Sequence, residues 1–197
     1  NGELFAHLYG TQVRYDHQRG RWLVWKGHWW GADPDGQRQR WAVEMARIWG
    51  KAASDMPTEK QVAAALRHAR SSESQSKIEA TLKMASIQHP IADPGTGWDS
   101  APTLLGVANG VVNLATGELR AGRQDDLITP STPVPFDPSA KCPRWVQFIS
   151  EIFEGDREMI DYIQRAVGYS LSGSTAEQVW FICYGKGANG KSTFLEV

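Results

Sequence analysis

The sequence predicts a mixed α+β fold that ends in the start of an α/β unit. Three observations predict it. Turn residues flanked by β-formers mark two hairpin regions, one rich in tryptophan near the N-terminus and one after residue 103. Between and after these regions, apolar residues recur with the period of a helix. Near the C-terminus, a short apolar run precedes a glycine-rich loop and the first turn of a helix.

Composition places few constraints on function. The chain has 197 residues, 41% of them hydrophobic and 22% charged, with a net charge of −1, as in ordinary globular proteins. No apolar run approaches the roughly 18 residues of a membrane span, so no membrane partner is expected. The two cysteines, Cys142 and Cys183, predict no disulfide and fit a reducing cytoplasm. The five histidines lack metal-ligand spacing, so no zinc site is predicted.

Residues 1–35 are expected to form a small Trp-rich β element. A helix over residues 3–9, ended by Gly10, comes first. In "RWLVWKGHWW", Lys26 and Gly27 predict a two-residue turn that pairs Trp25 with His28 and Val24 with Trp29. Asp33 to Gly36, "DPDG", predict a further turn.

Residues 36–90 are expected to be a helical segment. Apolar residues at helical spacing predict a helix over residues 37–51. Thr58 with Gln61, and Ser72 with Gln75, each have the spacing of a capping box at the start of a helix. The proline- and glycine-rich stretch at 89–102 is the best internal boundary.

Residues 91–174 are expected to form a β-meander followed by helices. Asn109-Gly110 and Thr116-Gly117 predict its two turns. Pro143 suits the first position of a helix that ends near Gly155. Asp156 suits the N-cap of the next helix, which Gly173 closes.

Residues 175–197 carry the most specific signal. The apolar run "VWFICY", from Val179 to Tyr184, predicts a strand buried on both faces, and "KSTFLEV" predicts the first turn of a helix. Between them, "GKGANGKST" contains the phosphate-loop pattern G-x-x-x-x-G-K-[ST]. Glycines there allow close approach by phosphates, and successive backbone N–H groups form a nest for anions.

This loop predicts a site for ATP and Mg²⁺. Lys191 is expected to contact the β- and γ-phosphates, which makes it the catalytic candidate, and the Ser192 hydroxyl is expected to bind the Mg²⁺ ion. Lys186 also lies in the loop, but the motif gives it no fixed role. The expected phosphate-binding residues are Gly185, Lys186, Gly187, Ala188, Asn189, Gly190, Lys191, Ser192 and Thr193.

Two other signals have competing interpretations. Residues 1–51 hold six of the nine tryptophans and eight Lys or Arg against five Asp or Glu, which suits either base stacking or a packed aromatic core. The core is favoured, with Trp25 and Trp29 inside it. An acidic run from Glu151 to Asp161 is interpreted as a solvated helix face rather than as paired catalytic carboxylates.

Five stretches in one order carry a family resemblance. They are "VANGVVNLATGEL", "DLITPSTPVPFDP", "CPRWVQFISEIF", "GYSLSG" and "VWFICYGKGANGKSTFLEV". Together they resemble the phage- and plasmid-type primase-helicase family, related to the poxvirus primase-helicase. The resemblance runs from about residue 100 to the end and extends more weakly to "RWLVW".

The resemblance implies a superfamily 3 DNA helicase with an AAA+ ATPase domain. Such a protein assembles as a hexamer on single-stranded DNA, here in the cytoplasm of a bacterial host and encoded by a phage, prophage or plasmid. Lys191 matches the phosphate-binding lysine, Ser192 the Mg²⁺ ligand, and Asn189 a polar residue often found in this loop. Residues 91–174 match the flanking, collar-like module, and residues 175–197 the start of the ATPase domain.

The chain is therefore expected to be a fragment of an ATP-dependent helicase. Phosphoryl transfer also needs a second acidic metal ligand and usually an arginine, and neither has a counterpart here. We expect the chain itself to bind nucleotide weakly and to hydrolyse none. Two alternatives stay open: an unrelated P-loop ATPase, and a non-catalytic oligomerisation or DNA-binding module.

Overall fold

The structure, a computed structural model, describes residues 1–185, 187 and 189–196, which form two compact units. The first unit comprises Asn1–Trp98 and Arg123–Thr129, and the second comprises Asp99–Gly122 and Pro130–Val197. Each unit has its own small sheet and its own helices, so the predicted mixed α+β class is confirmed.

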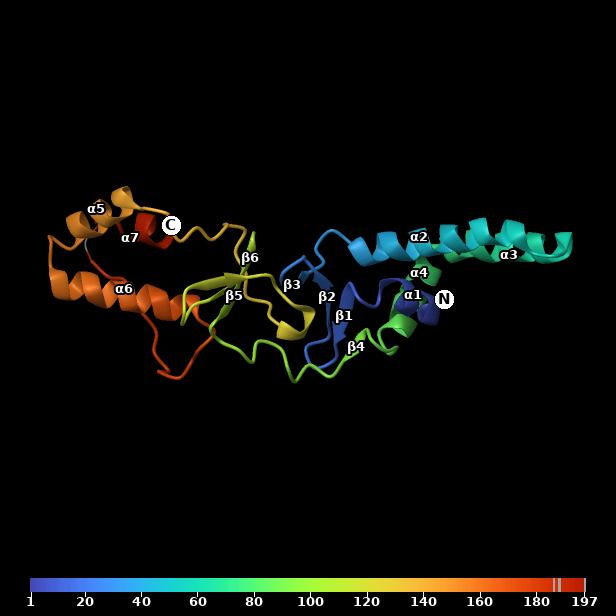
Figure 1. The fold of residues 1–197 in the computed structure, drawn as a ribbon, viewed down its shortest axis with the longest axis horizontal. Coiled ribbons are helices and arrows are strands. Elements are labelled where there is room, and N and C mark those ends of the chain that lie inside the picture. Colours follow the sequence, from blue (N-terminus) through green and yellow to red (C-terminus); the bar gives the residue numbers. More distant parts are fainter. Residues whose placement is uncertain (186, 188, 197) are drawn as a thin grey trace. The chain divides into compact units, whose positions relative to one another are not determined.

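The first unit is built on a four-stranded sheet with the order β3-β2-β1-β4 (Figure 1). Neighbouring strands run antiparallel, except that β4 pairs with β1 in parallel. No periodic pattern marks β4 in the sequence, because two residues are too few to show alternation. The strands are β1 (Val13–Asp16), β2 (Arg21–Trp25), β3 (Trp30–Ala32) and β4 (Ala92–Asp93).

The hairpin from β2 to β3 differs from the prediction. Trp25 pairs with Trp30, and the Lys26 N–H donates to the Trp29 carbonyl at 2.8 Å, so a four-residue loop replaces the expected two-residue turn. The longer loop brings the fully buried Trp30 beside Trp25, with ring centroids 5.2 Å apart. The tight turn would have placed His28 there instead. Packing of a large aromatic pair thus outweighs the local turn preference.

Helices cover the rest of the first unit. The Thr58 hydroxyl accepts a hydrogen bond from the Gln61 N–H at 3.3 Å, so the predicted cap is confirmed. The predicted cap at Ser72 is wrong, because Ser72 is buried as the last residue of α3 and accepts from the Asn1 amide at 3.0 Å. The helices are α1 (Gly2–Tyr9), α2 (Gln37–Ala52), α3 (Glu59–Ser72) and α4 (Gln75–Ala85), with 3₁₀ turns at Ala53–Asp55 and Gln124–Asp126.

Two apolar clusters form the core of this unit. The larger one joins α1, α2 and α4 to β1, and its main members are Phe5, Tyr9, Val13, Met45, Leu82 and Ile91. The smaller one consists of Leu23, Trp30 and Trp98, with Trp25 and Leu127 packed against it. The segment Arg123–Thr129 reaches this cluster because the Trp30 indole donates to the Gln124 carbonyl at 3.0 Å.

The second unit contains a meander and three helices. Its sheet has the order β5-β6-β7, as predicted, and Figure 1 shows α7 beside α5. Val107 pairs with Gly110, so the first turn is Ala108-Asn109, one residue earlier than expected. Two hydrogen bonds of 2.9 Å between the Asn109 side chain and the Phe136 backbone hold it there. The elements are β5 (Leu104–Val107), β6 (Gly110–Asn113), β7 (Glu118–Arg120), α5 (Pro143–Ile152), α6 (Arg157–Leu171) and α7 (Lys191–Glu196).

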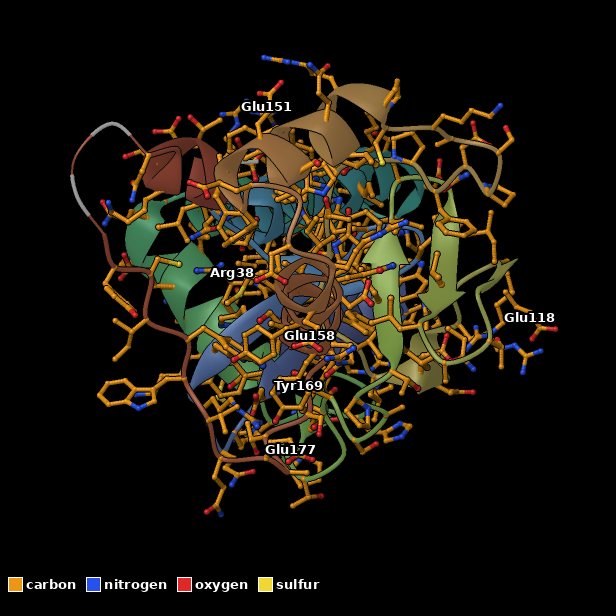
Figure 2. The ribbon with its side chains drawn as sticks, turned by 90° about the vertical axis from the view of Figure 1, so that its left-hand side faces the viewer. Arg38, Glu118, Glu151, Glu158, Tyr169 and Glu177 are labelled. Carbon is orange, nitrogen blue, oxygen red and sulfur yellow. The ribbon has the colours of Figure 1, made fainter. Side chains whose placement is uncertain are left out.

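Both predicted helix starts in this unit are confirmed. Pro143 is the first residue of α5, and the Asp156 carboxylate caps α6 by accepting from the Met159 N–H at 3.1 Å. The acidic run is exposed, as a solvated face requires, and Figure 2 shows Glu151 on the outer side of α5.

Candidate nucleotide-binding loop

The loop that carries the phosphate-binding pattern lies before α7. The Lys191 ammonium donates to the Gly185 carbonyl at 3.1 Å and to the Asn189 side-chain oxygen at 2.7 Å. Gly190 has a φ of 82°, a left-handed conformation that favours glycine. A Cβ atom at Gly185 would collide with the Asn189 amide. The structure thus brings Gly185, Asn189 and Lys191 together.

The remaining predicted residues of the loop divide into two groups. Ser192 and Thr193 lie in the first turn of α7, and both residues are exposed. Gly187 is also exposed. Lys186 and Ala188 lie outside the described residues, so their predicted contribution stays a prediction.

Asn189 has a role that spacing does not reveal. Its side-chain oxygen accepts from Lys191 and its amide lies against Gly185, so a single side chain ties the start of the loop to the lysine. The family resemblance marks Asn189 as a polar residue of the loop, but its contacts with Lys191 and Gly185 are seen only in the structure.

The predicted strand before the loop is wrong in this structure. Residues 178–184 have irregular backbone, and Trp180 and Tyr184 are 84% and 90% exposed. Cys183, expected to be buried, is exposed too. A strand needs neighbours for its N–H and C=O groups, and neither described sheet includes this segment. Contacts with α6 include the Tyr169 hydroxyl, which accepts from the Glu177 N–H at 3.2 Å, and the Tyr162 ring, whose centroid lies 6.3 Å from that of Phe181; Tyr169 and Glu177 are labelled in Figure 2.

Helix α5 packs against the loop. A Cβ atom at Gly190 would lie 2.8 Å from Ile152 Cγ2 and 3.2 Å from the Phe148 ring. Further along, the rings of Trp145 and Phe194 stack, with centroids 5.7 Å apart and planes inclined by 22°. The sequence predicts α5 and the loop separately, but no sequence signal indicates that they touch.

The Trp-rich element forms a packed structure. Trp30 is fully buried, and the Arg14 guanidinium lies 4.9 Å from the centre of its ring. The Arg38 guanidinium lies over Trp22 in the same way, at 5.8 Å. Trp41 stacks on Tyr9, with centroids 5.3 Å apart. These rings make their contacts within the chain, as a core requires.

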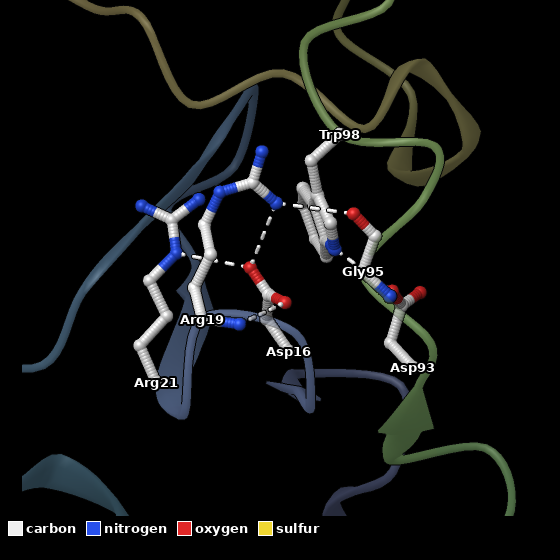
Figure 3. Close-up of polar contacts among 6 residues, drawn as sticks. All are labelled: Asp16, Arg19, Arg21, Asp93, Gly95 and Trp98. Carbon is white, nitrogen blue, oxygen red and sulfur yellow. Dashed lines mark hydrogen bonds and ion pairs between the residues drawn. The ribbon is translucent and has the colours of Figure 1, made fainter.

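A buried carboxylate anchors the end of β1 (Figure 3). Asp16 has no exposed surface and accepts from the Arg19 N–H at 3.0 Å, the Arg19 guanidinium at 3.3 Å and the Arg21 guanidinium at 3.2 Å. Burial by itself raises the pKa of Asp16, but these hydrogen bonds outweigh it and hold the pKa below its ordinary value. Arg19 also donates to the Gly95 carbonyl at 3.0 Å. The group is fully paired, which is the signature of a structural ion cluster.

Clustered metal ligands and membrane-spanning helices are both absent from the described residues. Across the described part of the chain, no three His, Cys, Asp or Glu side chains gather as a metal site requires. No helix within the described ranges combines the length and the apolar composition needed to cross a bilayer.

The chain is similar to a known protein family and to a viral protein. A family model described as D5 N terminal like matches residues 2–154. The chain is 31% identical over 97 residues to the "Putative helicase L207/L206" of Acanthamoeba polyphaga mimivirus. The aligned part covers 48% of this chain and 10% of that protein, so the chain spans a small fraction of its relative. The family match ends before the loop begins at Gly185.

Proposed function

This chain belongs to the D5 N terminal like family, a domain found in primase-helicase proteins, and from this premise we propose that it is part of an ATP-dependent DNA helicase. The helicase-named viral relative supports the same assignment. The proposal extends to a superfamily 3 helicase with an AAA+ ATPase domain, acting as a hexamer on single-stranded DNA in phage or plasmid replication within a bacterial cytoplasm.

One observation carries the ATP-binding part of the proposal. The complete phosphate-loop pattern includes Lys191, whose ammonium donates to two oxygen acceptors of its own loop. A γ-phosphate presents stronger, charged acceptors to the same ammonium. We therefore expect Lys191 to exchange its contacts with Gly185 and Asn189 for phosphate oxygens when nucleotide binds. Bound Mg²⁺ would neutralise phosphate charge beside the Ser192 hydroxyl.

Nucleotide titration tests this proposal. Wild-type chain is titrated with a fluorescent ATP analogue, mant-ATP, in the presence of Mg²⁺. Lys191→Ala should weaken binding by about ten- to a hundredfold, the scale of one charged hydrogen bond at about 1.5–3 kcal/mol. Its circular dichroism should match wild type, because Lys191 belongs to neither apolar cluster.

The matched control is Lys141→Ala, which removes an exposed lysine outside the loop. It should bind as wild type does. Equal affinity of wild type and Lys191→Ala would sink the assignment of the loop.

A second candidate function is favoured by where the family match ends. The match covers residues 2–154 and stops short of the loop, so the region that the family model describes does not include this motif. It would then serve as a non-catalytic assembly or DNA-binding unit. Sedimentation of the chain with and without single-stranded DNA tests this candidate, which requires either self-association or a complex.

A further inference from the structure

The contacts between α5 and the loop support an inference that rests on the proposed nucleotide binding. We propose that α5 positions the phosphate loop. Phe148 and Ile152 support Gly190, and Trp145 holds α7 through Phe194. In this arrangement these α5 side chains are positioning residues, which act on nucleotide through the loop rather than by touching it.

The first step is the close approach at Gly190. This residue directly precedes Lys191, so its backbone sets the direction in which the lysine leaves the loop. Its α-carbon faces Phe148 and Ile152 so closely that a methyl group would not fit, and its φ of 82° disfavours any other residue. Because Gly190 packs against Phe148 and Ile152, its backbone has little freedom to move.

The second step is the aromatic stack on α7. Phe194 lies in the helical turn that begins with Lys191 and Ser192, and its N–H donates to the Gly190 carbonyl at 2.9 Å. Its ring stacks on Trp145, whose ring in turn lies 5.6 Å from that of Phe148. One row of aromatic rings therefore supports both the last glycine of the loop and the helix that follows it.

The third step is the spacing along α5. Trp145, Phe148 and Ile152 follow at intervals of three and four residues, so they share one face of the helix. Val146 lies off that face and is 61% exposed. Since the family match ends at residue 154, α5 is the last helix inside it, and this face links the family domain to the loop.

If α5 only packed against the loop, truncating Trp145 would affect nucleotide binding differently than if α5 positioned the loop. If α5 only fills space, truncating Trp145 lowers stability and leaves the affinity of the folded protein unchanged. If α5 positions the loop, truncation leaves Lys191 less well placed, and affinity falls by part of the roughly ten- to hundredfold that its charged hydrogen bond contributes.

The test uses the whole chain with 5-fluorotryptophan in place of tryptophan. Trp145→Phe assigns the Trp145 fluorine resonance. Titration with Mg²⁺ and ATP should shift that resonance over the same concentrations at which mant-ATP binds. Lys191→Ala should abolish the shift.

Affinity measurements complete the test. Trp145→Ala should weaken mant-ATP binding by about tenfold. Trp145→Phe, which keeps a ring for stacking, should restore affinity to near that of wild type. The control Val146→Ala, on the exposed side of the same helix, should bind as wild type does. If Trp145→Ala fails to fold, the fluorine shift in the wild-type chain decides whether α5 responds to bound nucleotide.

The outcomes separate the two proposals. Two results would overturn the role of α5 without contradicting nucleotide binding. In one, the wild-type chain binds mant-ATP but the Trp145 fluorine resonance does not shift. In the other, Trp145→Ala folds and its affinity for mant-ATP is unchanged. A wild-type chain that binds no mant-ATP overturns both.

Discussion

At the residue scale, the buried Asp16 carboxylate is the strongest polar anchor of the first unit. Asp16→Asn keeps the shape of the side chain but removes the charge that Arg19 and Arg21 face. We expect unfolding free energy to fall by about 1–3 kcal/mol, as for other hydrogen bonds to buried charged groups. Both arginines are over a third exposed, so solvent screening keeps the loss below that of a fully buried pair.

The pH dependence of this loss has a definite sign. The pKa of Asp16 is lowered on folding, so its stabilisation is present above the unfolded pKa of about 4 and is lost as pH falls through the lower, folded value. Urea unfolding at neutral and acid pH should show a smaller acid dependence in Asp16→Asn than in wild type. Asp35→Asn is the control, because its ion pair with Arg40 at 2.8 Å is exposed and worth little. If Asp16→Asn and Asp35→Asn lowered the free energy of unfolding equally, the result would contradict the prediction.

Tyr9 should give the opposite pH dependence, a loss of stability at alkaline rather than acid pH. Burial, and then the nearby Glu44 carboxylate to which its hydroxyl donates, raise the pKa of Tyr9 from 10.0 to about 12. Because the unfolded phenol ionises first, stability is fully present below pH 10 and is lost as pH rises toward 12.

Between pH 10 and 12, the melting temperature should therefore fall more steeply with pH for wild type than for Tyr9→Phe. Tyr184→Phe, at a tyrosine that is 90% exposed, should melt as wild type does across the range. A Tyr9→Phe variant with the wild-type slope would show that the buried phenol does not control this dependence.

At the element scale, the register of the β2–β3 hairpin decides which tryptophan supports the sheet. Trp30 is fully buried between Trp25 and Trp98, whereas Trp29 is half-buried in the loop. Trp30→Ala should cost about 3–5 kcal/mol, the scale of a large aromatic lost from a core. Trp29→Ala should cost much less.

Chemical denaturation of the two single variants measures this difference directly. The two residues are identical in type and adjacent in sequence, so the comparison isolates the buried contacts that Trp30 makes and Trp29 does not. If Trp29→Ala lowers the free energy of unfolding more than Trp30→Ala does, the result would favour the two-residue turn that the sequence predicts.

Two helix starts with local signals could be predicted from the sequence, whereas two hairpin turns that the sequence also marks locally lie elsewhere than expected. Pro143 and Asp156 mark helix starts by chemistry that acts within one turn, and both start where expected. Elements that depend on distant partners could not. Ser72 is the clearest case, because its contact with Asn1 spans 71 positions and makes it part of a helix rather than a cap.

The loop region shows the same division. Its glycines and Lys191 are evident from spacing, since the chemistry of phosphate binding requires them. The link from Asn189 to Lys191 and the seat of Gly190 on Phe148 arise only when the chain folds. The strand at residues 178–184 fails for a related reason: apolarity alone does not make a strand without a sheet to join.

At the scale of the whole molecule, the aromatic and charged groups decide between a core and a nucleic-acid platform. Base stacking needs exposed ring faces beside a basic groove. Here Trp30 is buried and Trp41 stacks on Tyr9, while the net charge of the chain is −1. Arg14 lies over Trp30 rather than in a groove for phosphates.

We therefore expect the Trp-rich element to contribute little to DNA affinity. Fluorescence anisotropy with a labelled single-stranded oligonucleotide should show weak binding by the chain, with a shallow dependence on salt. A stacked base is worth about 1–3 kcal/mol, so Trp29→Ala would weaken binding by roughly fivefold or more if its half-exposed ring were a platform. We expect no such change, because residues 1–51 carry only eight Lys or Arg against five Asp or Glu and the whole chain has a net charge of −1. Tight, salt-sensitive binding that Trp29→Ala removes, with its thermal melt unchanged, would establish this element as a DNA-binding surface instead.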